Sequence, residues 1–474
     1  MLRTASRLVA GLVTTGLISA LAALGTASTA SAQTPQSPLT GARVVTTGSP
    51  HAGHGGRVYY VDATSGKDTN SGRRPSSAWK SLARVDAATL APGDVVAFHR
   101  GDTFAGSATI SDAGTAQRPI TLTAYGHGDQ PVLTNPGQWN MLVLDAPHVQ
   151  VKNLAFQDGA VFDNADQQGI RGPKYELSGA IAITANGSDT LVQDDTFTDV
   201  GVGVKTYGAG STIDHNTFKD LRIAFRGVDT LGCGCETSYG AIGVSVDNSR
   251  VHLTWNDFIN CRSTDSPYGA DGGAVEIEGF DFPKDDIVIG HNYSLASQGF
   301  VEVTETSSSH VRIDYNVSDD YQQFLAWDTT TTPSDYLATN NTIVHQRDRS
   351  QLIAQYYYRE DGPAPSASWA TFRNNIFDSR GSWSFYDFPH DHNLYTDASK
   401  LAGFALGTGD LVADPEFADR TTDDLRLTAG SPAIDAGVRI PGATRDLVGH
   451  RVPAGFAPDL GAYEYRSHGF GHRA

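Results

Sequence analysis

Short stretches in which apolar and polar residues alternate recur along most of the chain, and such alternation predicts β-strands with one buried face. Eight of these stretches place an Asn or Asp shortly after the apolar strand: VQVKNLAF, TLVQDDTF, STIDHNTF, VHLTWNDF, IVIGHNYS, VRIDYNVS, YLATNNTI and ATFRNNIF. The recurrent polar residues are Asn153, Asp194, Asn216, Asn256, Asn292, Asn316, Asn341 and Asn375. The sequence interval between these residues corresponds to one short coil. Such a repeat predicts an all-β solenoid, in which each coil buries its inward face by stacking on its neighbours.

We interpret these recurrent Asn and Asp residues as structural. Asn tolerates the left-handed backbone of a tight turn, and its amide can hydrogen-bond to the neighbouring coil. Ahead of the repeats, the sequence predicts a strand at Val58–Val61, a helix from Ser76 or Ser77 to about Ala88, and a strand at Gly93–Phe98. We expect residues 58–104 to form a cap over the N-terminal end of the solenoid, because a repeat array must cover its terminal core.

The beginning of the chain has the pattern of an export signal. Arg3 and Arg7 precede an apolar run from Leu8 to Leu24, and a small-residue cleavage site follows at Ala30-Ser31-Ala32. The sequence thus predicts a signal peptide over residues 1–32, a disordered lead-in over 33–57, one β-helix domain over 58–465 and a tail over 466–474. No later apolar run is long enough for a membrane helix, so we expect a secreted, monomeric, extracellular protein.

Composition narrows the range of partners. The chain has 474 residues, a net charge of -18 and 50 glycines. This acidity argues against binding to nucleic acid or to anionic membranes. The three cysteines predict one disulfide, between Cys261 and either Cys233 or Cys235, because a Cys233–Cys235 bridge would close a very small and strained loop. A zinc site is not expected, since the chain has no CxxC pair.

Several motifs resemble the pectin-lyase-like family of right-handed parallel β-helix proteins. They are STIDHNTF followed by GAIGVSV, and the C-terminal DLRLTAGSPAIDAG and DLGAYE, which are similar to the ending of secreted bacterial members. The resemblance covers most of Tyr59 to Tyr465. It implies a polysaccharide-active protein on this fold, but the scaffold hosts lyases, glycoside hydrolases, epimerases, esterases and phage tailspikes, so the reaction has to be argued from the site.

Three strands between Ala274 and Thr329, which read AVEIEG, FVEVTE and FLAWDT, predict the site. Alternation places Val275, Val301 and Trp327 inside, and it places a set of polar residues on the exposed face: Glu276, Glu278, Glu302, Thr304 and Asp328. We call the four carboxylates Glu276, Glu278, Glu302 and Asp328 the acidic face. Like charges on adjacent strands are destabilising, so we interpret the acidic face as catalytic; the alternative is a solvated acidic surface without a role in catalysis.

Stacking the predicted strands gives two outward columns. One contains Ala182, Gly203, Gly243, Glu276, Glu302, Ala326 and Ala354, and the other contains Thr184, Lys205, Ser245, Glu278, Thr304, Asp328 and Tyr356. Long insertions on both sides of these strands predict the walls of a groove. The residues expected to bind substrate in this groove are Lys205, Asp271, Thr304, Tyr356 and Tyr357.

Two chemistries can use the acidic face. A glycoside hydrolase needs one protonated and one ionised carboxyl. Glu276 and Glu302 on adjacent coils should lie about 5 Å apart, whereas Glu278 and Asp328, two coils apart, should lie about 10 Å apart. We expect Asp328 or Glu278 to be the acid and Glu302 or Glu276 its partner, with no cofactor.

A polysaccharide lyase instead needs a base and a cation that neutralises a uronate, and Glu276, Glu278 and Glu302 could then be Ca²⁺ ligands. Lys205 is the only cation in the outward columns and is expected about 10 Å from Glu278. Because no cation lies closer, the sequence favours hydrolysis over elimination. A non-catalytic carbohydrate-binding β-helix is the third possibility.

Overall fold

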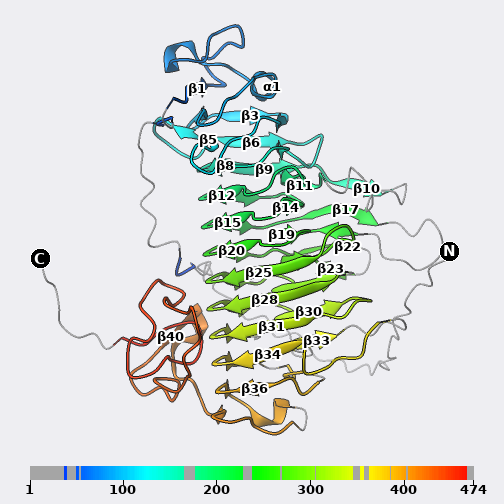
Figure 1. Cartoon of the computed structure of the whole chain (residues 1–474), viewed down its shortest axis with the longest axis vertical. Coiled ribbons are helices and arrows are strands. Elements are labelled where there is room, and N and C mark those ends of the chain that lie inside the picture. Colours follow the sequence, from blue (N-terminus) through cyan, green and yellow to red (C-terminus); the bar gives the residue numbers. More distant parts are fainter. Residues whose placement is uncertain are drawn as a thin grey trace, which may run out of the picture.

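A computed structural model describes residues 37–39, 50–52, 55–164, 177–227, 238–266, 269–304, 306–344, 353–356, 362–379, 381–384, 386–401 and 404–466. Three long sheets run along the molecule and, strand by strand, the chain winds through them in turn (Figure 1). Within each sheet the neighbouring strands are parallel, and parallel strands joined by such crossovers form right-handed connections. The all-β parallel solenoid predicted from the repeats is therefore confirmed.

The first sheet is the one that faces the viewer in Figure 1. Its strands, in spatial order, are β1 (Val58–Val61), β2 (Val95–His99), β5 (Ile120–Tyr125), β8 (Val149–Lys152), β12 (Leu191–Gln193), β15 (Thr212–Asp214), β20 (His252–Thr254), β25 (Lys284–Gly290), β28 (Ser308–Asp314), β31 (Ser334–Thr339), β34 (Ala370–Arg373) and β36 (His390–Asp391).

The second sheet follows the first at each turn. It comprises β3 (Thr103–Ala105), β6 (Val132–Asn135), β9 (Ala155–Gly159), β13 (Thr196–Thr198), β16 (Thr217–Lys219), β21 (Asp257–Ile259), β26 (Tyr293–Leu295), β29 (Val317–Asp319), β32 (Thr342–Ile343), β35 (Ile376–Phe377), β37 (Leu394–Tyr395) and β38 (Leu411–Val412).

The third sheet contains the three strands of the acidic face. It comprises β4 (Ala108–Ile110), β7 (Leu142–Leu144), β11 (Gly179–Ile183), β14 (Val202–Thr206), β19 (Ile242–Val246), β24 (Gly273–Ile277), β27 (Val301–Thr304), β30 (Leu325–Asp328) and β33 (Ala354–Tyr356). The remaining strands form small sheets: β10 (Phe162–Asn164) with β17 (Ile223–Gly227) and β18 (Tyr239–Gly240), β22 (Ser263–Ser266) with β23 (Gly269–Asp271), and β39 (Phe417–Asp419) with β40 (Asp424–Leu427).

The interior of the solenoid is filled by stacks of like residues, one from each coil. The aromatic residue of the repeated motif points inward, and the rings of Phe156, Phe197, Phe218 and Phe258 stack with centroid separations of 4.7 to 5.0 Å. All four side chains are buried. The periodic sequence motif thus produces a continuous core, because each ring covers the face of the next.

An asparagine ladder joins the coils at the turn between the first and second sheets. The backbone N–H of each ladder residue donates to the side-chain oxygen of the next one along the axis, at distances of 2.9 to 3.0 Å, in the order Asn216, Asn256, Asn292, Asn316, Asn341, Asn375 and Asn393. Each side-chain amide from Asn216 to Asn375 also donates to the ladder residue that follows. The structural role predicted for these asparagines is confirmed.

Two members of the predicted series were placed one residue too early. Asn153 and Asp194 have φ values of 60° and 58° and occupy the left-handed position of the turn. The next residue occupies the ladder position, so Asp195 begins the ladder by accepting from the N–H of Leu154 and donating its own N–H to Asn216. In the other coils the left-handed residue also precedes the ladder Asn, as at His215. The ladder Asn therefore serves as a hydrogen-bonding residue rather than as the left-handed one.

The N-terminal cap contains less helix than predicted. Between Ser76 and Ala88 the structure has a 3₁₀ turn at η2 (Pro75–Ser77) and one short helix, α1 (Leu82–Asp86). The side chain of Ser81 caps α1 by accepting from the N–H of Arg84. The prediction was wrong because the intervening Trp79 pairs with Val61 as an isolated β-bridge and is buried, which requires an extended backbone.

Residues 37–39 and the C-terminal segment of the described chain pack against each other and against the solenoid. Within the stretch expected to be a disordered lead-in, Ser37 donates to Asp257, and Leu39 is buried among Tyr293, Leu295 and residues of the C-terminal segment. That segment, which contains η3 (Ala398–Leu401) and η4 (Arg420–Thr422), lies beside the lower coils in Figure 1. In the part of the chain that the structure describes, no helix has the length and apolarity needed to cross a membrane.

Candidate active site

The third sheet brings the predicted carboxylates together on one face. Glu276 of β24 is paired in register with Glu302 of β27, and Thr304 of β27 is paired with Asp328 of β30. Glu278 directly follows β24, and its N–H bonds to the carbonyl of Val246. Since paired residues on neighbouring strands lie about 4.8 Å apart, the side chains of Glu276 and Glu302 are neighbours.

The register of two strands differs from the predicted columns. Lys205 of β14 is paired with Ser245 of β19, and Ser245 is paired with Glu276 of β24. The predicted columns instead align Lys205 and Ser245 with Glu278. Ala182 is likewise paired with Lys205 and not with Gly203. Both strands are displaced by two residues relative to the prediction. A slip of two residues leaves the inward and outward sides of a strand unchanged, so the apolar pattern could not reveal it.

A slip of one residue in β33 has a larger effect. Tyr356 is paired with the fully buried Trp327, whereas the prediction paired it with Asp328. Its ring contacts Trp369 at a centroid distance of 5.5 Å and packs against the core. The predicted substrate-binding role of Tyr356 is not supported by this inward position, because a one-residue slip moves a side chain to the other face. Tyr357, the other predicted aromatic, lies outside the described residues.

Lys205 lies much closer to the acidic face than predicted. Its Nζ is 3.1 Å from Oε1 of Glu278 and 3.4 Å from Oδ2 of Asp247, in place of the separation of about 10 Å expected from the misaligned columns. The side chain of Lys205 is completely buried. It therefore does not contact substrate directly. The preference for hydrolysis rested on the expectation that no cation lies near the acidic face, and this expectation was wrong.

Glu278 is held by several donors at once. Its Oε1 accepts from Lys205 Nζ and from the hydroxyl of Tyr239 at 2.5 Å, and the hydroxyl of Ser245 lies 2.6 Å from the same oxygen. Only 5% of the Glu278 residue surface is exposed, and Lys205, Ser245 and Asp247 are fully buried. Hydrogen bonds of this kind favour the ionised form of a carboxyl group. We call Lys205, Tyr239, Ser245 and Asp247 the buried quartet.

The buried quartet has perturbed acid–base properties. Burial raises the pKa of Asp247 to about 6, although the charge of Lys205 partly opposes this. Burial also lowers the pKa of Lys205, but the charges of Asp247 and Glu278 outweigh it and raise the pKa overall. The pKa of Tyr239 is raised by burial and then by the charges of Glu278 and Glu276. Lys205 thus stays an ammonium ion and Tyr239 a neutral hydroxyl donor.

The other carboxylates reach the surface. Glu276, Glu302, Asp328 and Asp271 are each partly exposed. The pKa of Glu276 is raised well above its ordinary value, first by burial and then by the charges of Glu278, Glu302 and Asp271. One face thus combines a carboxyl group whose pKa is raised with a neighbouring carboxyl group that accepts from an ammonium and a hydroxyl group. The chain has only nine glutamates, and three of them lie here.

Small sheets stand beside this face as the predicted walls. The β10–β17–β18 sheet and the β22–β23 hairpin precede strands of the third sheet and project to the same side of the solenoid (Figure 1). The β10–β17–β18 sheet packs on its own apolar cluster, in which the ring centroids of Trp139 and Phe225 lie 4.4 Å apart. Tyr239 enters the site from this wall and Asp271 from the hairpin. Beyond Glu278, the ring of Phe280 is 59% exposed.

Sequence reasoning missed Asp247 and Tyr239. Asp247 could have been found, because the alternation of Val244, Ser245, Val246 and Asp247 places it on the same face as Ser245. Tyr239 could not, since it follows a long insertion without any periodic pattern. Its place in the site depends on how the wall folds back onto β19.

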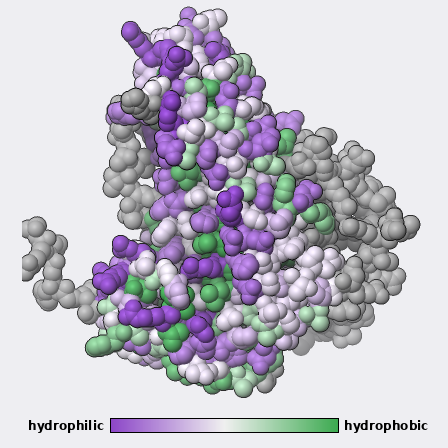
Figure 2. Space-filling view, viewed as in Figure 1, coloured by the Kyte–Doolittle hydropathy of each residue, from purple (hydrophilic) through white to green (hydrophobic). Residues whose placement is uncertain are grey.

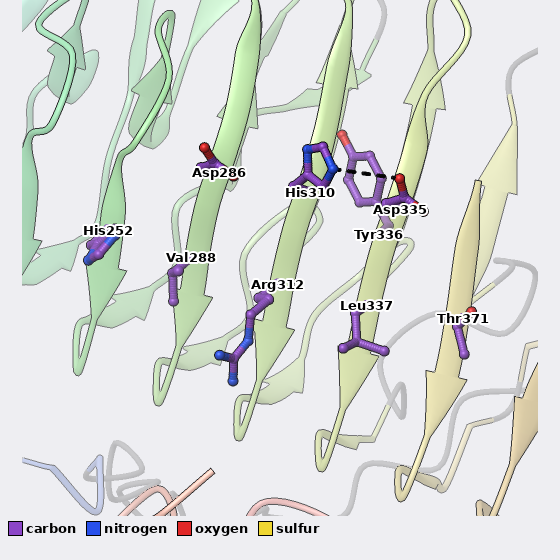
Figure 3. Close-up of a pocket in the computed structure, with 9 residues that line it drawn as sticks. All are labelled: His252, Asp286, Val288, His310, Arg312, Asp335, Tyr336, Leu337 and Thr371. Atoms are coloured by element: carbon purple, nitrogen blue, oxygen red, sulfur yellow. Dashed lines mark ion pairs between the residues drawn. The ribbon is translucent and has the colours of Figure 1, made fainter. Parts of the chain in front are cut away.

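Two other polar clusters lie away from the acidic face. A shallow groove of about 540 Å³ crosses the first sheet; Figure 3 shows its lining residues on strands β20, β25, β28, β31 and β34. The ion pair drawn there joins His310 and Asp335 at 3.8 Å. Figure 2 shows the same side of the molecule as a mixture of hydrophilic residues with smaller hydrophobic areas. The groove belongs to a different sheet from the carboxylates and is not part of the candidate active site.

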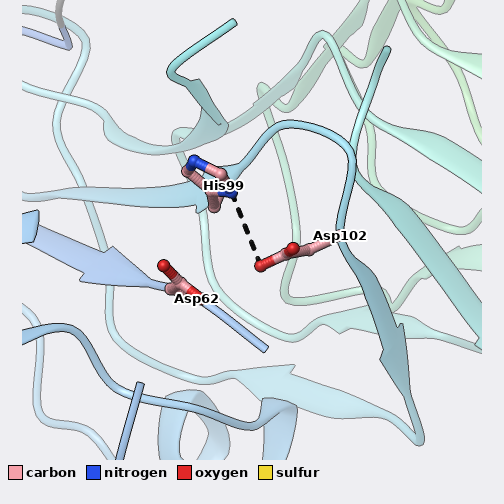
Figure 4. A group of neighbouring side chains, drawn as sticks. All are labelled: Asp62, His99 and Asp102. Atoms are coloured by element: carbon pink, nitrogen blue, oxygen red, sulfur yellow. Dashed lines mark ion pairs between the residues drawn. The ribbon is translucent and has the colours of Figure 1, made fainter. Parts of the chain in front are cut away.

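Asp62, His99 and Asp102 form a second cluster in the N-terminal cap, with potential ligand atoms within 4.8 Å of one another (Figure 4). Their carboxylates already have partners: Asp62 accepts from the Ser65 hydroxyl at 2.6 Å, and Asp102 accepts from the N–H of Ala63 at 2.8 Å. These bonds close the loop after β1. We therefore interpret the cluster as part of the cap rather than as a metal site.

The predicted disulfide is not present at Cys261. This residue is a buried free thiol whose Sγ lies 3.8 Å from the carbonyl oxygen of Phe218, and burial raises its pKa. The prediction was wrong for Cys261 because its side chain points into the core rather than toward the wall. Cys233 and Cys235 lie outside the described residues.

Comparisons with known proteins agree with this fold. No protein-family model matches the chain. The chain is 33% identical over 162 residues to a lacto-N-biosidase of Bifidobacterium longum subsp. longum, which is 28% of this chain and 10% of that protein. It is 37% identical over 68 residues to an α-1,3-galactosidase A of Akkermansia muciniphila, which is 14% of this chain and 11% of that protein. The chain thus spans about a tenth of the length of these curated relatives.

Among solved structures, the complex of XylC with xylose superimposes with a TM-score of 0.50, at 10% identity, over 86% of this chain and 98% of that chain. At such low identity this likeness concerns the fold alone. Together with the three parallel sheets, it confirms the right-handed parallel β-helix that the sequence motifs indicated.

Proposed function

We propose that this protein is a secreted glycoside hydrolase that cleaves a glycan with carboxylates of the acidic face. The observation that carries the proposal is the register pairing of Glu276 with Glu302 beside Glu278, which accepts a hydrogen bond from Lys205. A glycosidase requires one protonated carboxyl group that donates to the leaving oxygen and one ionised partner. The two curated relatives, which are named as a biosidase and a galactosidase, support the same class of reaction.

We assign the acid role to Glu276. Its raised pKa favours the protonated form, and it is partly exposed, so it can reach a glycosidic oxygen. Glu278 is unsuited to this role because Lys205 and Tyr239 both donate to one of its oxygens and little of it is exposed. Glu302 is the partner. The strands that carry Glu302 and Glu276 lie about 4.8 Å apart, and side chains projecting from paired positions can reach the carboxyl spacing of about 5 Å that is typical of retaining enzymes.

The nearby Lys205 does not turn the site into a lyase. A lysine acts as a base only when it is neutral, and the two carboxylates at 3.1 and 3.4 Å keep this one protonated. It is also buried, so it cannot reach a sugar proton. The same ammonium already compensates Glu278, which reduces the attraction of this carboxylate for Ca²⁺. Asp271 and Thr304 remain candidates for substrate contacts at the edges of the acidic face. Asp328, which the sequence predicts as a possible acid, is paired with Thr304 one coil beyond Glu302, and we propose that it contacts substrate there.

The exported protein should be incubated with two groups of glycans. The first group contains α-1,3-linked galactosides and N-acetylhexosamine-containing oligosaccharides, and the second contains uronate polymers. New reducing ends that persist in EDTA, without the ultraviolet absorbance of unsaturated ends, are expected. Unsaturated ends that disappear on chelation would instead identify a calcium-dependent lyase. Binding that survives in Glu276→Gln, with no turnover by either protein, would identify a carbohydrate-binding module.

A further inference from the structure

The least exposed part of the site is the buried quartet, and its members come from three separate elements. Lys205 lies in β14, Tyr239 in β18, and Ser245 in β19, while Asp247 follows β19. Lys205 Nζ contacts all of the others: Tyr239 at 3.0 Å, Ser245 at 2.9 Å and Asp247 at 3.4 Å. A buried ammonium ion needs several partners, because removing its charge from water is costly.

Three members of the quartet converge on a single atom. Lys205, Tyr239 and Ser245 each approach Oε1 of Glu278, at 3.1, 2.5 and 2.6 Å. Asp247 accepts a hydrogen bond from Ser245 and forms an ion pair with Lys205, both through Oδ2. Its position is that of a counter-ion for Lys205. The charge, the two hydroxyl groups and the counter-ion thus form one connected unit.

Building on the proposed function, we propose that the buried quartet is a positioning assembly: it holds Glu278 ionised and immobile, and the fixed charge of Glu278 keeps the neighbouring Glu276 in its acid form. Glu276 and Glu278 are two residues apart at the end of one strand, so their side chains leave the same face. A negative charge fixed at that position disfavours a second one beside it. Glu278 is then required for catalysis without touching the glycan.

Charged and titratable groups surround the pair on all sides. The groups that face Glu276 and Glu278 come from every neighbouring element: Lys205, Tyr239, Asp247, Asp271, Lys284 and Glu302. Lys284 is occupied by the carbonyl oxygens of Gly279 and Phe282, at 2.8 and 2.6 Å. Among the described residues, Lys205 is thus the cation that contacts Glu278.

Tyr239→Phe is the sharpest test, since it removes one donor to Glu278 without changing charge or volume appreciably. The full chain should be labelled with carbon-13 at the glutamate carboxyl, where nine glutamates give a simple NMR spectrum. Glu276→Gln and Glu278→Gln identify the two signals. In the wild type, the Glu278 signal should remain that of a carboxylate below the ordinary glutamate pKa of about 4.3, while the Glu276 signal titrates above it. In Tyr239→Phe both titrations should move, that of Glu278 upward.

Tyr336→Phe is the matched control, because Tyr336 is a buried tyrosine on the first sheet that bonds to the hydroxyl of Ser308 at 2.6 Å. It should lower thermal stability to a similar degree and leave both titrations unchanged. On a glycan substrate, Tyr239→Phe should lower kcat/KM roughly tenfold and shift the alkaline limb of the pH profile, as expected for losing a hydrogen bond to a charged group.

Lys205→Met should abolish activity, but this variant could also fail to fold. The tyrosine variant avoids that ambiguity. An ordinary titration of Glu278 in the wild type, or titrations that Tyr239→Phe leaves unmoved, would overturn the inference. A wild type that cleaves no glycan but shows the predicted titrations would instead refute the proposed function and leave the positioning assembly intact.

Discussion

Lys205 of β14 donates a hydrogen bond at 3.1 Å to Glu278, which follows β24, on the outward side of the third sheet. The contact distinguishes the carboxylates of the acidic face. Glu278 is buried and accepts from Lys205, whereas Glu276 and Glu302 are partly exposed. This division explains how one cluster of like charges can contain both a proton donor and an ionised partner.

Replacing Glu276 by Gln should lower kcat about 10²- to 10⁴-fold, because general acid catalysis contributes roughly this factor. Substrates with a good leaving group, such as nitrophenyl glycosides, should lose much less, since their leaving oxygen needs little protonation. Circular dichroism and thermal unfolding should stay close to those of the wild type. Equal losses on good and poor leaving groups would show that Glu276 is not the acid.

Glu302→Ala separates the two stereochemical outcomes. If Glu302 is the nucleophile of a retaining enzyme, azide should restore activity by attacking the sugar in the space that the side chain leaves, and the product would be a glycosyl azide. Measurement of that product by mass spectrometry is decisive for this role. Failure of azide to rescue, together with inversion at the anomeric carbon measured by NMR, would assign Glu302 as a base for water instead.

Gly279 connects the backbone to the buried quartet. It has a φ of +93°, and a Cβ at this position would lie 2.7 Å from Oδ1 of Asp247. Gly279→Ala should therefore lose about 1–3 kcal/mol of stability from backbone strain and should also lower activity. Gly101→Ala is the matched control, because its φ is +81° and no atom lies within 4 Å of the added Cβ. The control should lose stability alone; equal activity losses would remove Asp247 from the account.

The asparagine ladder should determine stability but not chemistry. Asn316→Ala removes acceptors and donors that are fully buried, which costs about 1–3 kcal/mol for each unsatisfied group. The exposed Asn186→Ala should change stability by less than about 0.5 kcal/mol. Denaturant unfolding of both variants checks this. Residual activity of Asn316→Ala at low temperature should equal that of the wild type.

The C-terminal segment predicts how stability depends on pH. Burial raises the pKa of Glu464 to about 7 and that of Asp459 to about 6. The folded chain thus binds more protons at these groups than the unfolded chain does, so their contribution to stability is full below about pH 4 and is lost as the pH rises toward 7. Glu464→Gln should flatten the dependence of the melting temperature on pH between these values. An unchanged slope would contradict the burial of Glu464.

The repeats of the sequence were sufficient to predict the solenoid and the face on which the carboxylates lie, because both depend on the alternation of side chains. They were not sufficient for register. A two-residue slip in β14 and β19 preserves the pattern, and it hid the contact between Lys205 and Glu278. The inward turn of Tyr356 and the entry of Tyr239 from a wall depend on tertiary packing, which no local pattern encodes.

The central claim is that the acidic face adds water across a glycosidic bond. It is tested most directly by cleaving a glycan in water enriched in the heavy isotope oxygen-18 and measuring the masses of the products by mass spectrometry. Hydrolysis predicts one heavy oxygen in each new reducing end, in the wild type and not in Glu276→Gln. Products that lack the label and are lighter by one water would show elimination and would contradict the account.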